Sequence, residues 1–197
     1  MGALLKFSNL MDRVSTWIGK YVIWLILAST LISGVNALVR KIFNTSSNAY
    51  LEVQWYLFAA SFLLAAGYTL LNNEHVKIDV VSSKFSKETQ IKIDIFGFVV
   101  FLMPLCLAIL WYSTPFFYKG LISGEVSSNA GGLIRWPVYA MIPLGFGLLM
   151  LQGVSELIKR VAFLKGLIED PTAKKVEKTA EEDLAEAIRK LAETKAS

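Results

Sequence analysis

The sequence predicts an all-α membrane protein with four transmembrane helices. Four stretches, residues 21–39, 53–73, 95–118 and 136–155, contain no Lys, Arg, Asp, Glu or His. Their lengths of 19 to 24 residues fit the roughly 20 apolar residues that a helix needs to cross a bilayer. Only 18% of all residues are charged, against about 25% in soluble domains. We expect a membrane domain over residues 1–170 and a polar cytoplasmic tail over residues 171–197.

The first span carries small residues on one face. Ser29, Ser33 and Ala37 are spaced by four, and small residues at that spacing let a second helix approach closely. Before this span, apolar residues recur at spacings of three and four, and they are Leu4, Phe7, Met11, Val14 and Ile18. This pattern predicts either an amphipathic helix lying at the membrane interface or an N-terminal extension of the first span.

The second span begins with Glu52 and Trp55, which lie one helical turn apart. The indole of Trp55 is typical of the headgroup level. Glu52 has two interpretations. It pairs with Arg40 or Lys41 at the outer end of the span, or it contacts another protein.

The connection after the second span contains His75, Lys77 and Asp79 in alternation with apolar residues. Asp79 is a candidate N-cap for a short interfacial helix that begins at Val80. Because the chain has one His, we interpret His75 as a solvated loop residue and expect no metal site.

The third and fourth spans contain Pro104 and Pro143, and each proline is expected to kink its helix. The outer connection between these spans begins with Gly124 and Glu125. Glu125 is a second candidate for contact with a partner. The tail after residue 170 has a capping box at Thr179 and Glu182, which predicts a charged C-terminal helix.

The positions of the basic residues predict the orientation. Ten Lys and Arg residues lie in the N-terminal segment, in the second connection and just after the fourth span, against four in the other two connections. Basic loops stay in the cytoplasm, so both termini are predicted to be cytoplasmic. The excess positive charge therefore sets the topology and does not indicate a nucleic-acid partner.

The charge-free spans also exclude classes of function. Proton relays, ion sites and voltage sensors place ionisable groups at bilayer depth, and a haem-binding bundle needs axial ligands within its helices. We therefore expect no catalysis and no cofactor, and predict a subunit that works by packing against another protein. A membrane chaperone or a signalling subunit would show the same features and stays as an alternative.

The boundary motifs, taken in order, resemble the small membrane subunit, called DctQ-like, of tripartite ATP-independent periplasmic (TRAP) transporters. The similarity runs from about Trp17 to Arg160. It includes Glu52 with Trp55, the His-Val-Lys-Ile-Asp stretch at 75–79, the Gly-Glu-Ser-like connection at 124–127, and the Pro-Val-Tyr-Ala-Met-Ile-Pro-Leu-Gly run at 137–145, which contains Pro143 and Gly145. Lys77 stands where the family commonly has Arg, and Val126 departs from the commonest connection.

The resemblance implies a division of labour in the bacterial inner membrane. A periplasmic substrate-binding protein captures an organic anion, commonly a carboxylate. A large elevator-type permease then imports it with a sodium gradient, and the small subunit enlarges the permease scaffold. The charge-free spans fit a subunit with no transport site of its own.

Overall fold

A computed structural model describes residues 1–45, 47–74 and 85–172 of the chain. The helices are α1 (Gly2–Phe43), α2 (Asn48–Leu71), α4 (Lys87–Gly97), the π-helix η1 (Phe98–Leu102), α5 (Met103–Ser123) and α6 (Trp136–Leu164). Four helical segments are long and apolar enough to cross a membrane: α1, α2, the run Lys87–Ser123, and α6. The predicted four-span, all-α class is therefore confirmed.

Some expectations fall on parts of the chain that the structure does not describe. His75, Lys77 and Asp79, with the short helix predicted at Val80, lie outside the described residues. So does the charged C-terminal helix predicted within residues 171–197, of which only the first two residues are described.

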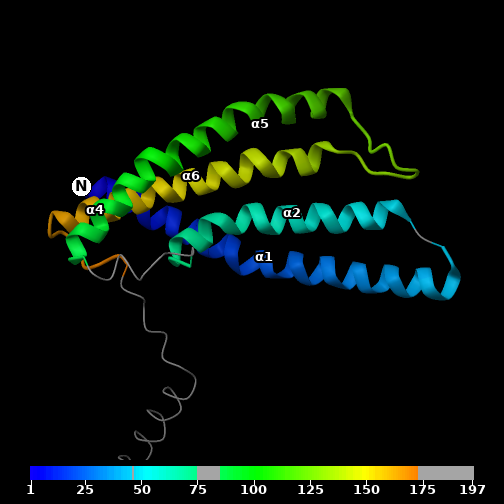
Figure 1. The fold of residues 1–197 in the computed structure, drawn as a ribbon, viewed down its shortest axis with the longest axis horizontal. Helices are drawn as coiled ribbons and strands as arrows, with labels where there is room; N and C mark the ends of the chain where they lie inside the picture. The colour runs from blue at the N-terminus through cyan, green and yellow to red at the C-terminus, as the bar shows by residue number, and fades with distance from the viewer. Residues whose placement is uncertain (46, 75–84, 173–197) are drawn as a thin grey trace, which may run out of the picture.

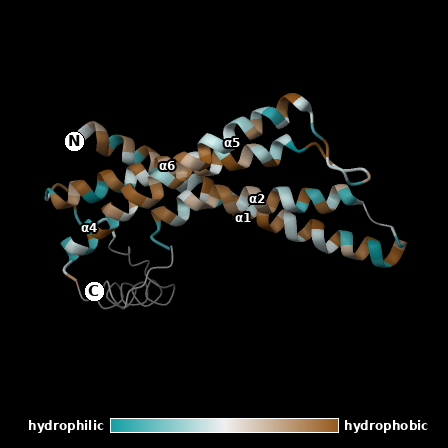
Figure 2. Cartoon of the chain, turned by 45° about the horizontal axis from the view of Figure 1, so that its top comes forward, coloured by the Kyte–Doolittle hydropathy of each residue, from teal (hydrophilic) through white to brown (hydrophobic). Residues whose placement is uncertain are grey.

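The spanning helices lie side by side in the order α5, α6, α2, α1 (Figure 1). α2 packs between α1 and α6, whereas α5 packs mainly on α6. The N-terminal part of α1 also contacts α6, near the end of the layer where the chain begins. Apolar residues cover much of the length of the helices (Figure 2). The chain is thus a layer of helices, and much of its apolar surface is exposed.

α1 decides between the two interpretations of the N-terminal segment. It runs without a break from Gly2 to Phe43, so the segment is an extension of the first span and not a separate interfacial helix. At 1.5 Å per residue the helix is about 63 Å long, twice the ~30 Å of the hydrocarbon core. In the N-terminal part of α1 the buried residues are Ser8, Ser15 and Gly19. These small residues form the face of the helix that packs on the neighbouring helices.

The two prolines have different local surroundings. Before Pro104 the chain forms the π-helix η1, in which the Met103 N–H donates to the carbonyl oxygen of Phe98, five residues back. A proline ring collides with the carbonyl four residues before it, and a wider turn gives the ring room. α6, in contrast, continues through Pro143 to Leu164.

Gly145 lies at a close contact between α2 and α6. A Cβ built on Gly145 would lie 2.7 Å from the Cβ of Leu63 and 2.8 Å from its carbonyl oxygen. The absence of a side chain at this position therefore lets the backbones of the two helices meet. Residues 137–145, which carry part of the family resemblance, therefore end at this packing contact.

We predict that Gly145→Ala destabilises the protein by about 1–3 kcal/mol, the usual cost of overpacking. The measurement is the thermal unfolding of the purified chain in detergent. Gly34→Ala is the matched control, because a Cβ on Gly34 meets nothing within 4 Å. Equal melting temperatures for the two variants would contradict this packing role.

Candidate functional site

The connection between α5 and α6 is a short hairpin. Gly124 closes α5 in the left-handed conformation, with φ of 60°. Val126 and Ile134 form an antiparallel bridge. On either side of it the Ser127 N–H donates to the Leu133 carbonyl (2.9 Å) and the Arg135 N–H donates to the Glu125 carbonyl (2.9 Å). The backbone of residues 124–135 is therefore held in a defined shape.

Glu52 binds this hairpin from the second turn of α2. Its side chain is buried, and Oε1 accepts hydrogen bonds from Ser127 Oγ and from Asn129 Nδ2 (2.8 Å). Oε2 accepts the backbone N–H of Leu133 at 2.7 Å. We call Glu52 and these three partners the hairpin clamp. It fixes the α5–α6 connection to α2.

Two further residues on the same face of α2 strengthen this attachment. Asn48 and Tyr56, each four residues from Glu52, donate to the carbonyl oxygens of Ala130 (3.0 Å) and Ile134 (3.1 Å). This face is turned to the hairpin. The expected pairing of Glu52 with Arg40 or Lys41 is therefore wrong for the described residues, since its carboxylate is occupied by the hairpin clamp.

Glu125 lies at the base of the hairpin and is exposed. Its Oε1 accepts hydrogen bonds from Arg135 at 2.9 Å and from the Tyr139 hydroxyl at 3.2 Å. Glu125 and Arg135 thus form an ion pair across the hairpin ends. At such an exposed site an ion pair contributes little to stability, because water screens the two charges.

A second group of polar residues lies towards the C-terminal end of α6. Arg160 is fully buried, and its guanidinium pairs with the carboxylates of Glu156 and Asp94 (3.1 Å to Asp94). It also donates to Asn73 Oδ1 at 3.3 Å. The ring of Phe98 lies 4.6 Å from the guanidinium carbon, in cation–π geometry. Arg160 thereby joins α6 to α4, to η1 and to the end of α2.

Lys159 and its neighbours join α6 to α1. The Lys159 ammonium pairs with Asp12 at 3.1 Å and also with Glu156. Gln152 accepts from Ser15 Oγ (2.8 Å) and donates to Asp12 (2.9 Å). The hydroxyl groups of Ser8 and Ser155 also form a hydrogen bond, at 2.7 Å. We use the name α6 ion cluster for all of these residues and those around Arg160.

The sequence reasoning missed this cluster. It counted Lys159 and Arg160 as charges beyond the fourth span, whereas both lie inside α6. The spacing of the polar residues in the sequence could have revealed the cluster. The cluster residues of α6 are 152, 155, 156, 159 and 160. Positions i, i+3, i+4, i+7 and i+8 share one helix face. A polar stripe with this period on a span predicts a polar contact with another helix.

The segment after α6 returns to the start of α4. Asp170 pairs with Lys87 at 2.9 Å and accepts the N–H and hydroxyl of Thr172. Burial acts to raise the pKa of Asp170, but the hydrogen bonds from Lys87 and Thr172 outweigh it and hold that pKa below its usual value. The pair therefore stabilises the fold above the usual aspartate pKa and is lost as the pH falls below it.

The small residues of α1 do not act as one set. Ser29 Oγ donates to the backbone oxygen of Gln54 at 3.2 Å and so contacts α2. Ser33 and Ala37 are exposed. Ser33 and Trp55 line a shallow hollow of about 370 Å³ between α1 and α2, together with Ser29, Thr30, Gln54 and Phe58.

The arrangement joins helices at both ends of the layer. Within residues 1–45, 47–74 and 85–172, no three His, Cys, Asp or Glu side chains are grouped so that they could hold a metal ion. The hairpin clamp and the α6 ion cluster instead link segments that are far apart in the sequence.

We predict that Glu52→Gln loosens the hairpin. An amide has one acceptor oxygen, so an N–H group would face one of the donors of the clamp, and bonds to charged groups are worth about 1.5–3 kcal/mol. Amide hydrogen exchange across residues 124–135 should accelerate by about tenfold or more. Glu125→Gln, at an exposed pair, is the control and should change exchange far less. Unchanged protection in the Glu52 variant would refute the clamp.

We predict that Arg160→Met costs about 3–5 kcal/mol of stability, as expected when one partner of a buried ion pair is removed. Arg160→Lys should fall between this variant and the wild type, because it keeps the charge but loses the planar fork. Denaturant unfolding in detergent measures both. Lys165→Met, at an exposed position, is the control and should stay within about 0.5 kcal/mol of the wild type.

The chain was compared with known protein families and with curated proteins. Residues 29–163 match the family described as "Tripartite ATP-independent periplasmic transporters, DctQ component". The matched region contains Glu52, the hairpin and all of α6 up to Phe163. Comparison with individually curated proteins finds none that matches. Since the family match covers more than half of the chain, this protein belongs to the DctQ family, the small component of TRAP transporters.

Proposed function

We propose that this chain is the scaffold subunit of a sodium-coupled TRAP transporter that imports an organic anion such as a carboxylate. In this proposal it packs against the large elevator-type permease and has no transport site of its own. The main supporting observation is the distribution of charge. The four sequence stretches predicted to cross the bilayer contain no Lys, Arg, Asp, Glu or His. The hairpin clamp and the α6 ion cluster join helices at the two ends.

The exposed apolar surface supports a large membrane partner. Trp55, Phe58 and Phe62 form a row on one face of α2 and are 64%, 62% and 71% exposed. α5 exposes Trp111 and Tyr112 to a similar extent. A layer of helices has two broad faces, and we propose that lipid covers one while the permease covers the other.

The hollow beside Ser33 is the proposed contact for a permease helix. Small residues of α1 lie there next to the large rings of Trp55 and Phe58, which suits close helix packing. Gln54 lines the same hollow, and its side-chain nitrogen is covered but makes no hydrogen bond with a described residue. A polar group of the permease would satisfy this donor.

The proposal also includes the membrane location of the chain and a second partner, the periplasmic substrate-binding protein. The excess of basic residues near the termini and in the second connection supports cytoplasmic termini in the bacterial inner membrane. The hairpin then faces the periplasm. Its exposed Glu125 is the proposed point of transient contact with the substrate-binding protein.

Co-expression with the large permease tests the proposal. The wild-type chain should co-purify with the permease in detergent and support uptake of an organic anion into proteoliposomes only when a sodium gradient is present. Ser33→Trp should lower recovery of the complex by about fivefold or more, since overpacking costs about 1–3 kcal/mol. Leu38→Trp, on the opposite face of α1 and already exposed, is the control.

Two results would contradict the proposal at different levels. A wild-type chain that never associates with the permease would exclude the scaffold function. Association that is equally strong in the Ser33 and Leu38 variants would exclude only the proposed contact face.

A further inference from the structure

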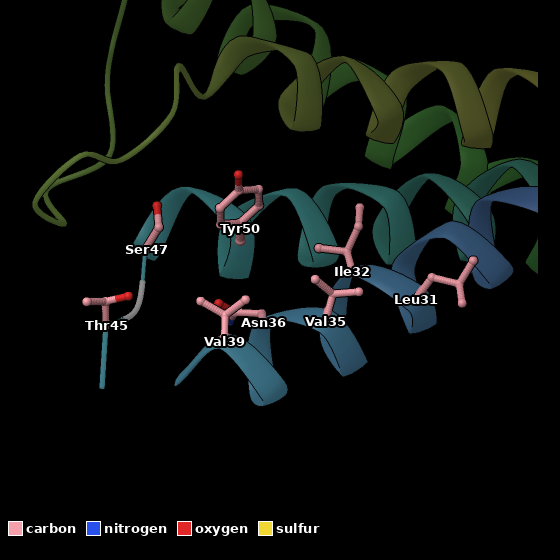
Figure 3. A pocket seen from close by; sticks show the side chains of 8 residues that line it. All are labelled: Leu31, Ile32, Val35, Asn36, Val39, Thr45, Ser47 and Tyr50. Atoms are coloured by element: carbon pink, nitrogen blue, oxygen red, sulfur yellow. The ribbon is translucent and has the colours of Figure 1, made fainter. Parts of the chain in front are cut away.

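A groove lies between the C-terminal end of α1 and the start of α2 (Figure 3). Its volume of about 560 Å³ lies within the range of roughly 300–1,000 Å³ that is usual for ligand sites. Leu31, Ile32, Val35 and Val39 of α1 form an aliphatic wall. Thr45, Ser47 and Tyr50 line the end nearest the α1–α2 connection and carry hydroxyl groups. The lining thus changes from apolar to polar along the groove.

Asn36 lines this groove with an unpaired carboxamide. Asn36 is only 9% exposed, and its carboxamide makes no hydrogen bond with a described residue. An unpaired amide within a span costs free energy, because hydrocarbon offers it no partner. The amide therefore needs an acceptor that enters the groove from outside the chain.

Arg40 lies one helical turn beyond Asn36 on the same face of α1, about 6 Å further along the axis. It is exposed and has no ion pair with a described residue. Along the helix the order is therefore a guanidinium, an amide at Asn36 and an aliphatic surface at Ile32 and Val35. A glycerophospholipid has the complementary order of phosphate, ester carbonyls and acyl chains.

We propose that the groove binds one glycerophospholipid. Arg40 holds the phosphate, the Asn36 amide donates to an ester carbonyl, and an acyl chain lies along Val35, Ile32 and Leu31. A transmembrane helix fits these groups less well, because its backbone carbonyls are already bonded within the helix. This site is separate from the hollow beside Ser33, which is lined by different residues of α1.

Native mass spectrometry of the full-length chain in detergent, with phosphatidylglycerol as the probe, tests the site. We expect one retained lipid per chain. Asn36→Leu and Arg40→Gln should each lower the bound fraction by about threefold to thirtyfold, the range expected for one polar contact at a membrane boundary. Lys41→Gln removes the same charge from another face of α1 and should bind like the wild type. Equal retention by the Asn36, Arg40 and Lys41 variants would overturn the proposal.

A second set of variants separates loss of lipid binding from a general loss of protein stability. Val35→Trp fills the groove and should abolish retention, whereas Leu38→Trp adds the same bulk outside it and should not. A photoreactive benzoylphenylalanine at position 39, in membranes that also contain the large permease, should form an adduct with the mass of one phospholipid. An adduct with a polypeptide would show that a protein segment occupies the groove and would overturn the lipid site.

Discussion

The bilayer itself is the constraint on which this structure depends. Apolar side chains gain little by leaving lipid for one another, so close packing and polar contacts must hold transmembrane helices together. The chain meets this requirement with the hairpin clamp at one end of the layer and the α6 ion cluster at the other. Between them, Gly145 brings α6 against the backbone of α2. α2 and α6 lie side by side in the middle of the layer, where α2 carries Glu52 of the hairpin clamp and α6 carries the ion cluster.

The α6 ion cluster contains buried charged groups that are paired with groups of opposite charge. A buried guanidinium would be very unfavourable alone, but Arg160 has the carboxylates of Glu156 and Asp94, the amide of Asn73 and the ring of Phe98 as partners. Hydrogen bonds of this kind are directional. The cluster therefore fixes the positions of α1, the end of α2, α4 and η1 relative to α6. An apolar contact in lipid would leave these segments free to slide. A fixed layer of this kind suits a subunit that serves as a scaffold.

Glu52 shows how far a boundary motif can be interpreted without a structure. Its place at the start of a span, one turn before Trp55, indicates a specific role at the membrane boundary. Two ideas for its partner were open, and the structure shows a third, the backbone and side chains of a hairpin about 80 residues away. Arg40 is nearer to Glu52 in the sequence than the hairpin is, but it lies on α1. Sequence distance therefore gave no guide to the contact.

The sequence by itself determined the number of spans, the all-helical class and the family, because length, absence of charge and the order of boundary motifs are local properties. It also contained the polar period of α6 without indicating its partner. Only the tertiary structure decided that Asp12, Asp94 and Asn73 surround this stripe, that Glu52 binds the hairpin, and that Ser29 and Ser33 have different environments. The reason is physical: in a layer of apolar helices the rotation and order of each helix are set by a few polar contacts between distant residues.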